Sequence, residues 1–492
     1  MNEGENKSGR YNISMKRILI LALAAACIPA ALAQKPKAKT KPQPKPTQKV
    51  KPAAGVPLTG IYEGAITLPN TLTLRMVFHF DGKGAGTWDS PDQAALGLKL
   101  TSALATGSNV TVTSATPPWR FTGKRSADGA SLTGTFEQNG AALELSLKKV
   151  AQVSTLRRPQ TPKAPFPYKT TEVSFPNPAE VGVTLVGTLS IPMGNGPFPC
   201  VVFITGSGQQ DRDSTIFEHK SFAVIADTLA RQGIASLRCD DRMVGKSKGD
   251  IAKATSASFA TDIEATVAFL KTRPEVNAKK IGLIGHSEGG LIAPMVAAKA
   301  ENGIAFIVML AGPGVPGDQI LIEQGAAVIK AAGMGEAVAA QARANQTKLL
   351  PIAKAEPDPQ KALDAMAKAL GLADAKALPA AAIAQLQQLT TPWMRYFLSY
   401  DPAPNIARVT CPVLALNGEK DTQVLVTQNL PVIEKLLKDA GNKDVTAVSL
   451  PNLNHLFQHA KTGGPGEYSQ IEETFSPEAL KLIGEWIVAR TK

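Results

Sequence analysis

Residues Gly285–Gly289 read GHSEG and match the pattern G-x-S-x-G of a nucleophilic serine. In this pattern the serine stands on a strained turn between a strand and a helix, and the glycines are required because side chains would not fit beside it. The apolar run Ile281–Ile284 precedes the pattern directly, and Leu291–Ala298, which is expected to be helical, follows it. This context predicts that Ser287 is a nucleophile.

A second segment, Gly245–Gly249, matches the same pattern with the letters GKSKG. It is separated from the nearest apolar run by Asp240, Asp241 and Arg242, and no strong helical stretch opens after it. Because the strand and the helix of a nucleophile turn are not evident here, we interpret Ser247 as an ordinary loop serine.

A serine hydroxyl becomes a good nucleophile when a neighbouring base takes its proton. In enzymes with this turn the acid and the histidine follow the serine in that order, on loops after later strands. Asp421 comes just after the expected strand Val413–Asn417, and the turn at Gly418 favours it over Glu419. Two other aspartates, Asp401 and Asp444, precede their strands and would lie at the wrong edge of the sheet. We therefore predict Asp421 as the acid.

The base is predicted to be His455, which follows the expected last strand Val445–Leu450 on a short loop. The chain has five histidines, and only this one has both the right order and a loop position. The others lie in the N-terminal β region, before the acid, or in the next expected helix: His79, His219, His286 and His459. Asp421 would then hold the imidazole in the required tautomer.

The oxyanion of the reaction intermediate needs hydrogen-bond donors. One donor is predicted to be the backbone N–H of Glu288, the residue after the nucleophile. The other is predicted to be the N–H of Ser207, in the glycine-containing loop Thr205–Gly208. The polar runs that follow, 209–213 and 240–242, favour a salt-bridge cluster that braces the loops, and we expect the Glu288 side chain to pair with an arginine of one of them.

From residue 166 to 492, short apolar runs alternate with helical patterns, which is typical of a parallel sheet with helical crossovers. The expected strands are Cys200–Ile204, Ile234–Arg238, Lys280–Ile284, Ile304–Leu310, Val413–Asn417 and Val445–Leu450. The alternation breaks at about 313–402, a segment rich in Ala, Gln and Leu. We predict a helical cap there, inserted between two strands at the carboxyl edge of the sheet.

Residues 56–150 predict a separate small β domain, joined to the rest by a polar, proline-rich linker at 151–165. Short apolar runs there are separated by Asp-Gly and Asn-Gly turn signals, which favour repeated hairpins in a small antiparallel barrel or sandwich. The region is too short for a multi-bladed propeller. Its polar run Trp88–Gln93 is expected to be a structured turn rather than a ligand site.

The N-terminus resembles an export signal over residues 1–33. Lys16 and Arg17 precede a short apolar core, and small residues at Ala31 and Ala33 predict cleavage before Gln34. The sequence leaves open whether translation starts at Met1 or Met15. It predicts an exported protein, periplasmic or extracellular, and disfavours lipoprotein processing at Cys27.

Charge is concentrated near the N-terminus. The formal net charge is +12, of which +9 belongs to residues 1–52, so the folded part is nearly neutral and a nucleic-acid partner is disfavoured. Residues 34–55 form a Lys/Pro-rich tether that is either a spacer or a contact to an anionic envelope surface. After cleavage three cysteines would remain, and we interpret Cys200, Cys239 and Cys411 as small buried residues rather than a disulfide framework.

Together these segments resemble bacterial α/β-hydrolase esterases related to dienelactone hydrolase and the serine aminopeptidase group, in particular secreted members with a small N-terminal β domain. The matching residues are Gly206–Gly208 with Gln210–Asp213, Asp240–Arg242 with Gly245–Ser247, Gly285–Gly290, Asn417–Gly418 with Asp421 and Gln423–Val424, Asn454–Phe457 and, in the β domain, Asp89–Gln93. The resemblance implies an α/β-hydrolase sheet, a Ser-Asp-His triad and hydrolysis of carboxylic esters without metal or cofactor. Two departures are Met243 where Gly is usual and Gln209 where Pro is common.

The leading hypothesis is a serine carboxylesterase that acts on short acyl esters, with a small-molecule ester as its partner. One alternative is a serine peptidase with the same triad. Another is a ligand-binding protein in which the β domain binds and the hydrolase domain is vestigial. The sequence leaves the natural substrate and the oligomeric state open.

Overall fold

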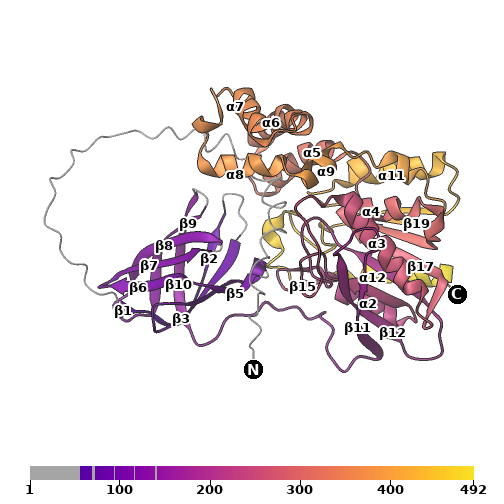
Figure 1. The fold of residues 1–492 in the computed structure, drawn as a ribbon, viewed down its shortest axis with the longest axis horizontal. Coiled ribbons are helices and arrows are strands. Elements are labelled where there is room, and N and C mark those ends of the chain that lie inside the picture. Colours follow the sequence, from indigo (N-terminus) through magenta and orange to yellow (C-terminus); the bar gives the residue numbers. More distant parts are fainter. Residues whose placement is uncertain (1–55, 69–72, 94, 116, 139–140, 492) are drawn as a thin grey trace.

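The computed structural model describes residues 56–68, 73–93, 95–115, 117–138 and 141–491, which form two domains (Figure 1). The predicted export signal, Cys27 and the Lys/Pro-rich tether lie outside these residues. Within the described ranges, no helix combines the length and apolar character needed to cross a membrane.

The N-terminal domain is one antiparallel sheet of ten strands in the order β1-β6-β7-β8-β9-β10-β2-β3-β4-β5. It curves into a half-barrel around an aromatic core that includes Phe78, Trp119 and Phe121 (Figure 1). The run Trp88–Gln93 forms the end of β4 and a short 3-10 helix, η1 (Pro91–Gln93). The strands are β1 (Val56–Pro57), β2 (Thr59–Thr67), β3 (Thr73–Asp81), β4 (Gly86–Ser90), β5 (Ala95–Lys99), β6 (Ser102–Thr106), β7 (Asn109–Ala115), β8 (Pro118–Arg125), β9 (Ser131–Gln138) and β10 (Ala141–Val150).

The C-terminal domain is built on an eight-stranded sheet in the order β11-β12-β16-β13-β17-β18-β19-β20. In sheet order, the strands β16, β13, β17, β18, β19 and β20 pair in parallel. The strands β11 and β12 add an antiparallel edge. The six expected strands are all present, whereas the edge pair was not among them. The bounds are β11 (Tyr168–Pro176), β12 (Thr184–Pro192), β13 (Phe198–Ile204), β16 (Ala235–Cys239), β17 (Val276–His286), β18 (Phe306–Leu310), β19 (Val413–Gly418) and β20 (Val445–Leu450).

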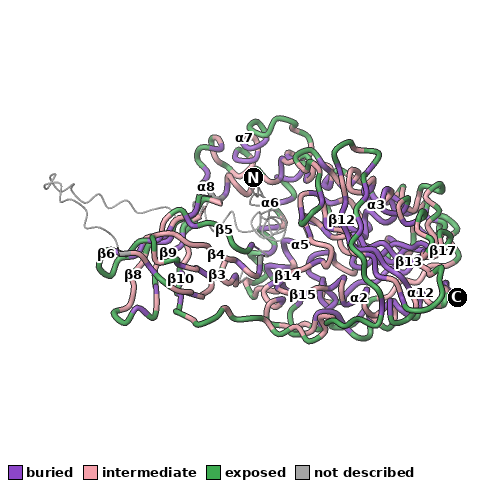
Figure 2. The backbone as a smooth tube through the Cα atoms, turned by 60° about the horizontal axis from the view of Figure 1, so that its bottom comes forward, coloured by how far each residue is buried: buried purple, intermediate pink, exposed green. Residues whose placement is uncertain are grey.

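Helices cover both faces of this sheet, so its central strands are almost continuously apolar and buried (Figure 2). One apolar cluster joins α3 and α4 to one face, and another joins α2 and α12 to the other. The helices are α2 (Ser221–Arg231), α3 (Ser256–Lys271), α4 (Glu288–Ala297), α11 (Val426–Asp439) and α12 (Pro477–Thr491), with the short η2 (Ala300–Asn302) and η4 (Pro465–Glu467).

A helical insertion between β18 and β19 lies across the top of the molecule in Figure 1, where the sequence predicted a cap. Its amphipathic helices pack on one another and on α3 and α4 through buried side chains such as Leu349, Leu363 and Phe397. The elements are α5 (Gly317–Ala331), α6 (Glu336–Ala355), α7 (Pro359–Ala369), η3 (Ala375–Ala377), α8 (Ala380–Leu389), α9 (Pro392–Ser399) and α10 (Ala403–Ile406). The predicted class, an α/β-hydrolase sheet with a cap and a preceding β domain, is therefore confirmed.

Candidate active site

Ser287 stands between the end of β17 and the start of α4, with φ 55° and ψ −119°. A non-glycine residue rarely adopts a positive φ, so this turn is strained. The two flanking glycines have no room for a side chain: a Cβ on Gly285 would lie 2.0 Å from the carbonyl oxygen of Gly289, and one on Gly289 would lie 2.1 Å from that of Ile204. The Ser287 N–H donates to Leu310 O at 2.8 Å and so holds the turn against β18. Ser287 itself is partly exposed.

Asp421 and His455 form a buried hydrogen-bonded pair, with 2.8 Å between His455 Nδ1 and Asp421 Oδ2. The loop after β19 carries the carboxylate, and the loop after β20 carries the imidazole. The backbone N–H groups of Gln423 and Val424 donate to the other carboxylate oxygen at 2.7 and 2.9 Å. These contacts fix the carboxylate and leave His455 Nε2 as the free ring nitrogen, whereas the competing Glu419 is exposed.

His286 connects the histidine loop to the turn that carries the serine. Its Nε2 donates to His455 O at 2.8 Å, and the two rings are 4.8 Å apart. Burial, reinforced by the neighbouring His455, lowers the pKa of His286 to about 3, so this ring stays neutral. Among the hydrogen bonds of the described residues, none joins His455 to Ser287 Oγ. A hydrogen bond between a catalytic base and its nucleophile is often long in the free enzyme and shortens in the substrate complex. The pairing of His455 with Ser287 is therefore a proposal.

The loop after β13 lies directly against the turn that carries Ser287. A Cβ on Gly206 would be 3.3 Å from the Ser287 Cβ, a close contact that glycine avoids. In the part of the chain that the structure describes, the N–H groups of Ser207 and Glu288 have no protein acceptor. The two predicted oxyanion donors thus stay available.

The carboxyl group of Asp241, which is partly buried, braces this loop at both ends. Thr205 Oγ1 donates to its Oδ1 at 2.7 Å, and the Gln210 N–H donates to its Oδ2 at 2.8 Å. Burial raises the pKa of Asp241 well above its ordinary value. A cavity of about 40 Å³ adjoins the loop, and Asp241 and Glu288 are among its lining residues. It has room for a few water molecules, which is too little for an ester substrate.

The prediction that Glu288 pairs with an arginine is wrong. Its carboxyl group accepts hydrogen bonds from Ser256 Oγ at 2.6 Å and from Trp393 Nε1 at 2.8 Å. Burial raises the pKa of Glu288, and hydrogen bonds from Ser256, Trp393 and Ser207 lower it in part. Because Trp393 belongs to α9, the cap contacts the nucleophile turn directly.

The arginines that were expected near Glu288 have other partners. Arg212 pairs with Asp240 at 2.7 Å, and Arg242 pairs with Asp262 at 2.7 Å. The expected salt-bridge cluster therefore does brace the loops 209–213 and 240–242, but it leaves no free guanidinium for Glu288.

Ser247, in the second G-x-S-x-G segment, is buried and its hydroxyl is fully used by backbone groups. Val186 N donates to Ser247 Oγ at 2.9 Å, and Ser247 Oγ donates to Asp240 O at 2.8 Å. The side chain thus ties strand β12 to the loop 240–247, as a loop serine would.

The sheet order, the strained serine turn and the acid–histidine pair define an α/β hydrolase. A family model described as X-Pro dipeptidyl-peptidase (S15 family) matches residues 182–456, which is more than half of the chain. The chain belongs to the X-Pro dipeptidyl-peptidase (S15) family.

Individual relatives include one named as an esterase and one named as a putative carboxymethylenebutenolidase. The chain is 27% identical over 313 residues to "Esterase EstD" of Thermotoga maritima, covering 62% of this chain and 65% of the relative. It is 30% identical over 136 residues to a "Putative carboxymethylenebutenolidase" of Synechocystis sp., covering 26% and 54%. The chain thus spans less than two thirds of the length of these relatives. The expected kinship with α/β-hydrolase esterases is confirmed.

Among solved structures, the Pyrococcus furiosus esterase Pf2001 is similar with a TM-score of 0.42 at 18% identity. The match covers 69% of this chain and 100% of that one.

Proposed function

We propose that the protein is a serine carboxylesterase that hydrolyses short-chain acyl esters through an acyl-enzyme intermediate. The observation that carries this proposal is the buried His455–Asp421 pair, which lies on loops beside the strained Ser287 turn. The name of the relative EstD supports an ester as the substrate.

In the proposed reaction Ser287 Oγ attacks the ester carbonyl carbon while its proton passes to His455 Nε2. Asp421, hydrogen-bonded to Nδ1, holds the ring in the required tautomer and stabilises the imidazolium. The negative charge that develops on the carbonyl oxygen is stabilised by the N–H groups of Ser207 and Glu288. The intermediate collapses, the C–O bond to the alcohol breaks, and His455 returns the proton to the leaving alcohol.

Deacylation repeats these steps with water. His455 Nε2 takes a proton from the water, whose oxygen attacks the acyl carbon, and the proton is then transferred to Ser287 Oγ as the acid leaves. Donors fixed in advance stabilise the oxyanion without reorganisation in the transition state. The hydrogen bonds that Asp241 accepts from Thr205 and Gln210 fix both ends of the Ser207 loop and so hold its N–H group in place.

The name of the family favours a second candidate, a serine peptidase that releases X-Pro dipeptides with the same triad. The two activities are separated by assaying one preparation against p-nitrophenyl esters from acetate to laurate and against X-Pro p-nitroanilides. The proposal predicts ester hydrolysis with the highest kcat/KM on short chains. Activity on the anilides alone would establish the peptidase, and inactivity on both series would favour a binding protein.

We also propose that the protein is exported and then located in the periplasm or outside the cell, with the Lys/Pro-rich tether close to an anionic envelope surface. Expression of the full chain in a Gram-negative host, followed by fractionation and N-terminal sequencing, tests the first part. The expected product starts at Gln34 in the periplasmic or external fraction. An uncleaved chain confined to the cytoplasm would contradict export.

A further inference from the structure

A short hairpin of the hydrolase domain inserts into the β domain. It consists of β14 (Thr215–Ile216) and β15 (His219–Lys220), and it follows the loop that carries Ser207. The side chain at its tip, Phe217, is 2% exposed and belongs to the aromatic core of the β domain. Tyr468 packs on it edge to face, at 6.4 Å between ring centroids, and is fully buried in the same cluster.

The tip of this hairpin has an unfavourable backbone conformation for its residue types. Phe217 has φ 47° and Glu218 has φ 63°, the pair of positive values for which tight hairpins normally use Asn-Gly. Non-glycine residues keep a positive φ only where the surrounding structure holds them in that conformation. The surroundings of this turn must therefore supply the restraint.

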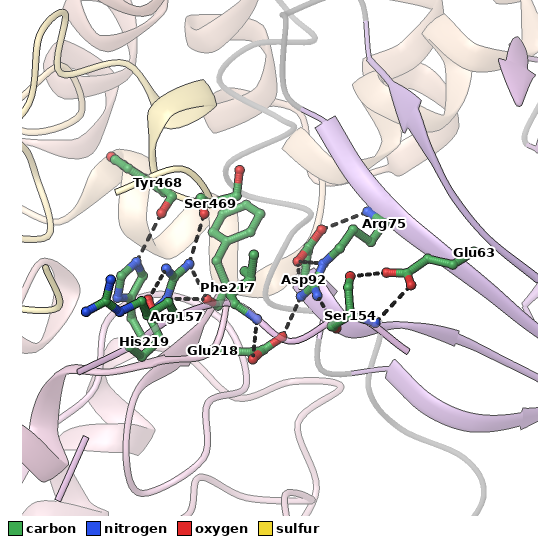
Figure 3. A network of polar contacts seen from close by, with 12 residues as sticks. Glu63, Arg75, Asp92, Ser154, Arg157, Phe217, Glu218, His219, Tyr468 and Ser469 are labelled. Atoms are coloured by element: carbon green, nitrogen blue, oxygen red, sulfur yellow. Dashed lines mark hydrogen bonds and ion pairs between the residues drawn. The ribbon is translucent and has the colours of Figure 1, made fainter. Parts of the chain in front are cut away.

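Polar groups of the β domain and of the linker hold this turn (Figure 3). Arg75 on β3 donates to Glu218 Oε1 at 2.6 Å and is itself held by the buried Asp92 of η1. The linker residue Arg158 donates to Phe217 O from Nε at 3.0 Å and from Nη2 at 2.9 Å. The polar run that contains Asp92 is thus part of a domain contact.

One set of hydrogen bonds leads from the hairpin to the proposed oxyanion loop. Ser214, also with a positive φ of 51°, donates from Oγ to Gln210 Oε1 at 2.8 Å. Gln210 Nε2 in turn lies 3.4 Å from Ser207 O, and the Gln210 N–H is held by Asp241. A shift of the hairpin would therefore move Ser207, whose N–H is the proposed oxyanion donor.

A second set of contacts leads from the same interface to the acid and the base. Tyr468 OH accepts from Gln423 Nε2 at 2.8 Å, and the Gln423 N–H donates to Asp421. Leu456, directly after His455, is 8% exposed and packs in the β-domain cluster. The loops that carry Ser207, Asp421 and His455 thus each connect to this interface, whereas Ser287 stands on a separate turn.

We propose that the β domain is a positioning domain: it holds the strained Phe217–Glu218 turn and Tyr468, and through them fixes the oxyanion loop and the acid and base loops. This inference rests on the proposed function. Phe217 and Glu218 are then positioning residues whose replacement lowers kcat without weakening substrate binding. A purely structural contact would alter stability and leave the turnover of each folded site unchanged.

The test compares Glu218→Gln with the matched control Glu323→Gln. Both carboxylates pair with an arginine and are similarly exposed, at 34% and 33% of the side chain, but Glu323 pairs with Arg343 within the cap. Assays with p-nitrophenyl acetate, well below the melting temperature, are normalised to sites titrated with diethyl p-nitrophenyl phosphate. We expect Glu218→Gln to lower kcat roughly ten- to hundredfold with KM unchanged, because small misplacements of catalytic groups have effects of this size. The control should match the parent.

A second pair, Phe217→Ala and Phe217→Leu, probes the apolar part of the interface. Alanine should lower kcat per titrated site, and leucine, which refills most of the volume, should restore part of it. If Glu218→Gln and Phe217→Ala both keep the kcat of the control, the positioning role is overturned while the esterase assignment stands. If the parent itself neither hydrolyses esters nor reacts with the phosphate, the proposed function fails instead.

Discussion

Two segments of this chain share the pattern G-x-S-x-G, yet the structure uses their serines in opposite ways. Ser287 is partly exposed on a strained turn at the end of β17, next to a loop whose histidine is paired with an aspartate. Ser247 is buried, and both its donor and its acceptor capacity are taken by backbone groups of β12 and Asp240. The pattern specifies little by itself; what distinguishes the two serines is the strand that ends before one of them and the partners left to its hydroxyl.

The largest difference between the two segments is expected in turnover. Ser287→Ala should lower kcat on p-nitrophenyl esters by about 10⁴-fold or more, because the nucleophile is lost. Ser247→Ala should keep the parent rate but lower stability by about 1–3 kcal/mol, because the buried Val186 N–H loses its acceptor. Ester assays of both variants measure kcat, and urea unfolding measures their stability. A rate loss in Ser247→Ala at full stability would reverse the assignment.

The proposed catalytic acid, Asp421, is expected to give the next largest effect. Asp421→Asn should lower kcat by about 10³- to 10⁴-fold, because the amide favours the wrong tautomer of His455. Glu419→Gln, at the exposed competing position two residues earlier, should be neutral. Steady-state assays of the two variants decide between the carboxylates, and a deficit in Glu419→Gln alone would assign the acid to that residue.

His286, in the first segment, is expected to make the stability of the protein depend on pH. Its pKa is lowered from 6.5 to about 3 by burial, so below pH 6.5 the unfolded chain binds a proton that the folded chain does not. Stability should therefore fall as the pH is lowered from 6.5 towards 3, by about 2 kcal/mol at pH 5 from this group alone.

Thermal unfolding of the parent, His286→Gln and the control His459→Gln between pH 7 and pH 5 tests this effect. His286→Gln should flatten the decline, and the exposed control should not. An identical slope in the parent and His286→Gln would show that His286 is protonated equally in both states.

The smallest expected effect lies in the turn that leads to the second segment. Met243 has φ 65°, a conformation in which glycine is favoured. Met243→Gly should raise the free energy of unfolding by up to about 1 kcal/mol, as relief of strain outweighs the added freedom of the unfolded chain. Chemical unfolding measures this, and a destabilised variant would show that contacts of the Met243 side chain outweigh the strain.

Local signals in the sequence were sufficient to predict the six strands β13 and β16–β20 and the order of the candidate residues along them. Runs such as Cys200–Ile204 and Val413–Asn417 are apolar because both faces of their strands are buried, and the order of Ser287, Asp421 and His455 follows from the order of those strands. The strands β11 and β12 were not predicted. In β11, exposed and buried residues are mixed, and β12 does not contain a clear apolar run.

Contacts between distant parts of the chain were not predictable in the same way. Trp393 reaches Glu288 across 105 positions, and which of several polar groups a buried carboxylate meets depends on the packing of the cap. The Phe217–Glu218 turn uses residues that no turn rule would select, since its conformation is fixed by another domain. The polar run around Asp92 was expected to be a structured turn, and its part in this contact was not predicted.

The central claim, that Ser287 is the nucleophile and Ser247 is structural, is tested most directly by covalent labelling. The parent, Ser287→Ala and Ser247→Ala are treated with a fluorophosphonate, and the modified residue is located by tandem mass spectrometry. We predict a single adduct on Ser287, within the tryptic peptide 281–299, in the parent and in Ser247→Ala, and none in Ser287→Ala. An adduct that persists in Ser287→Ala, or one carried by Ser247 in the parent, would contradict the account.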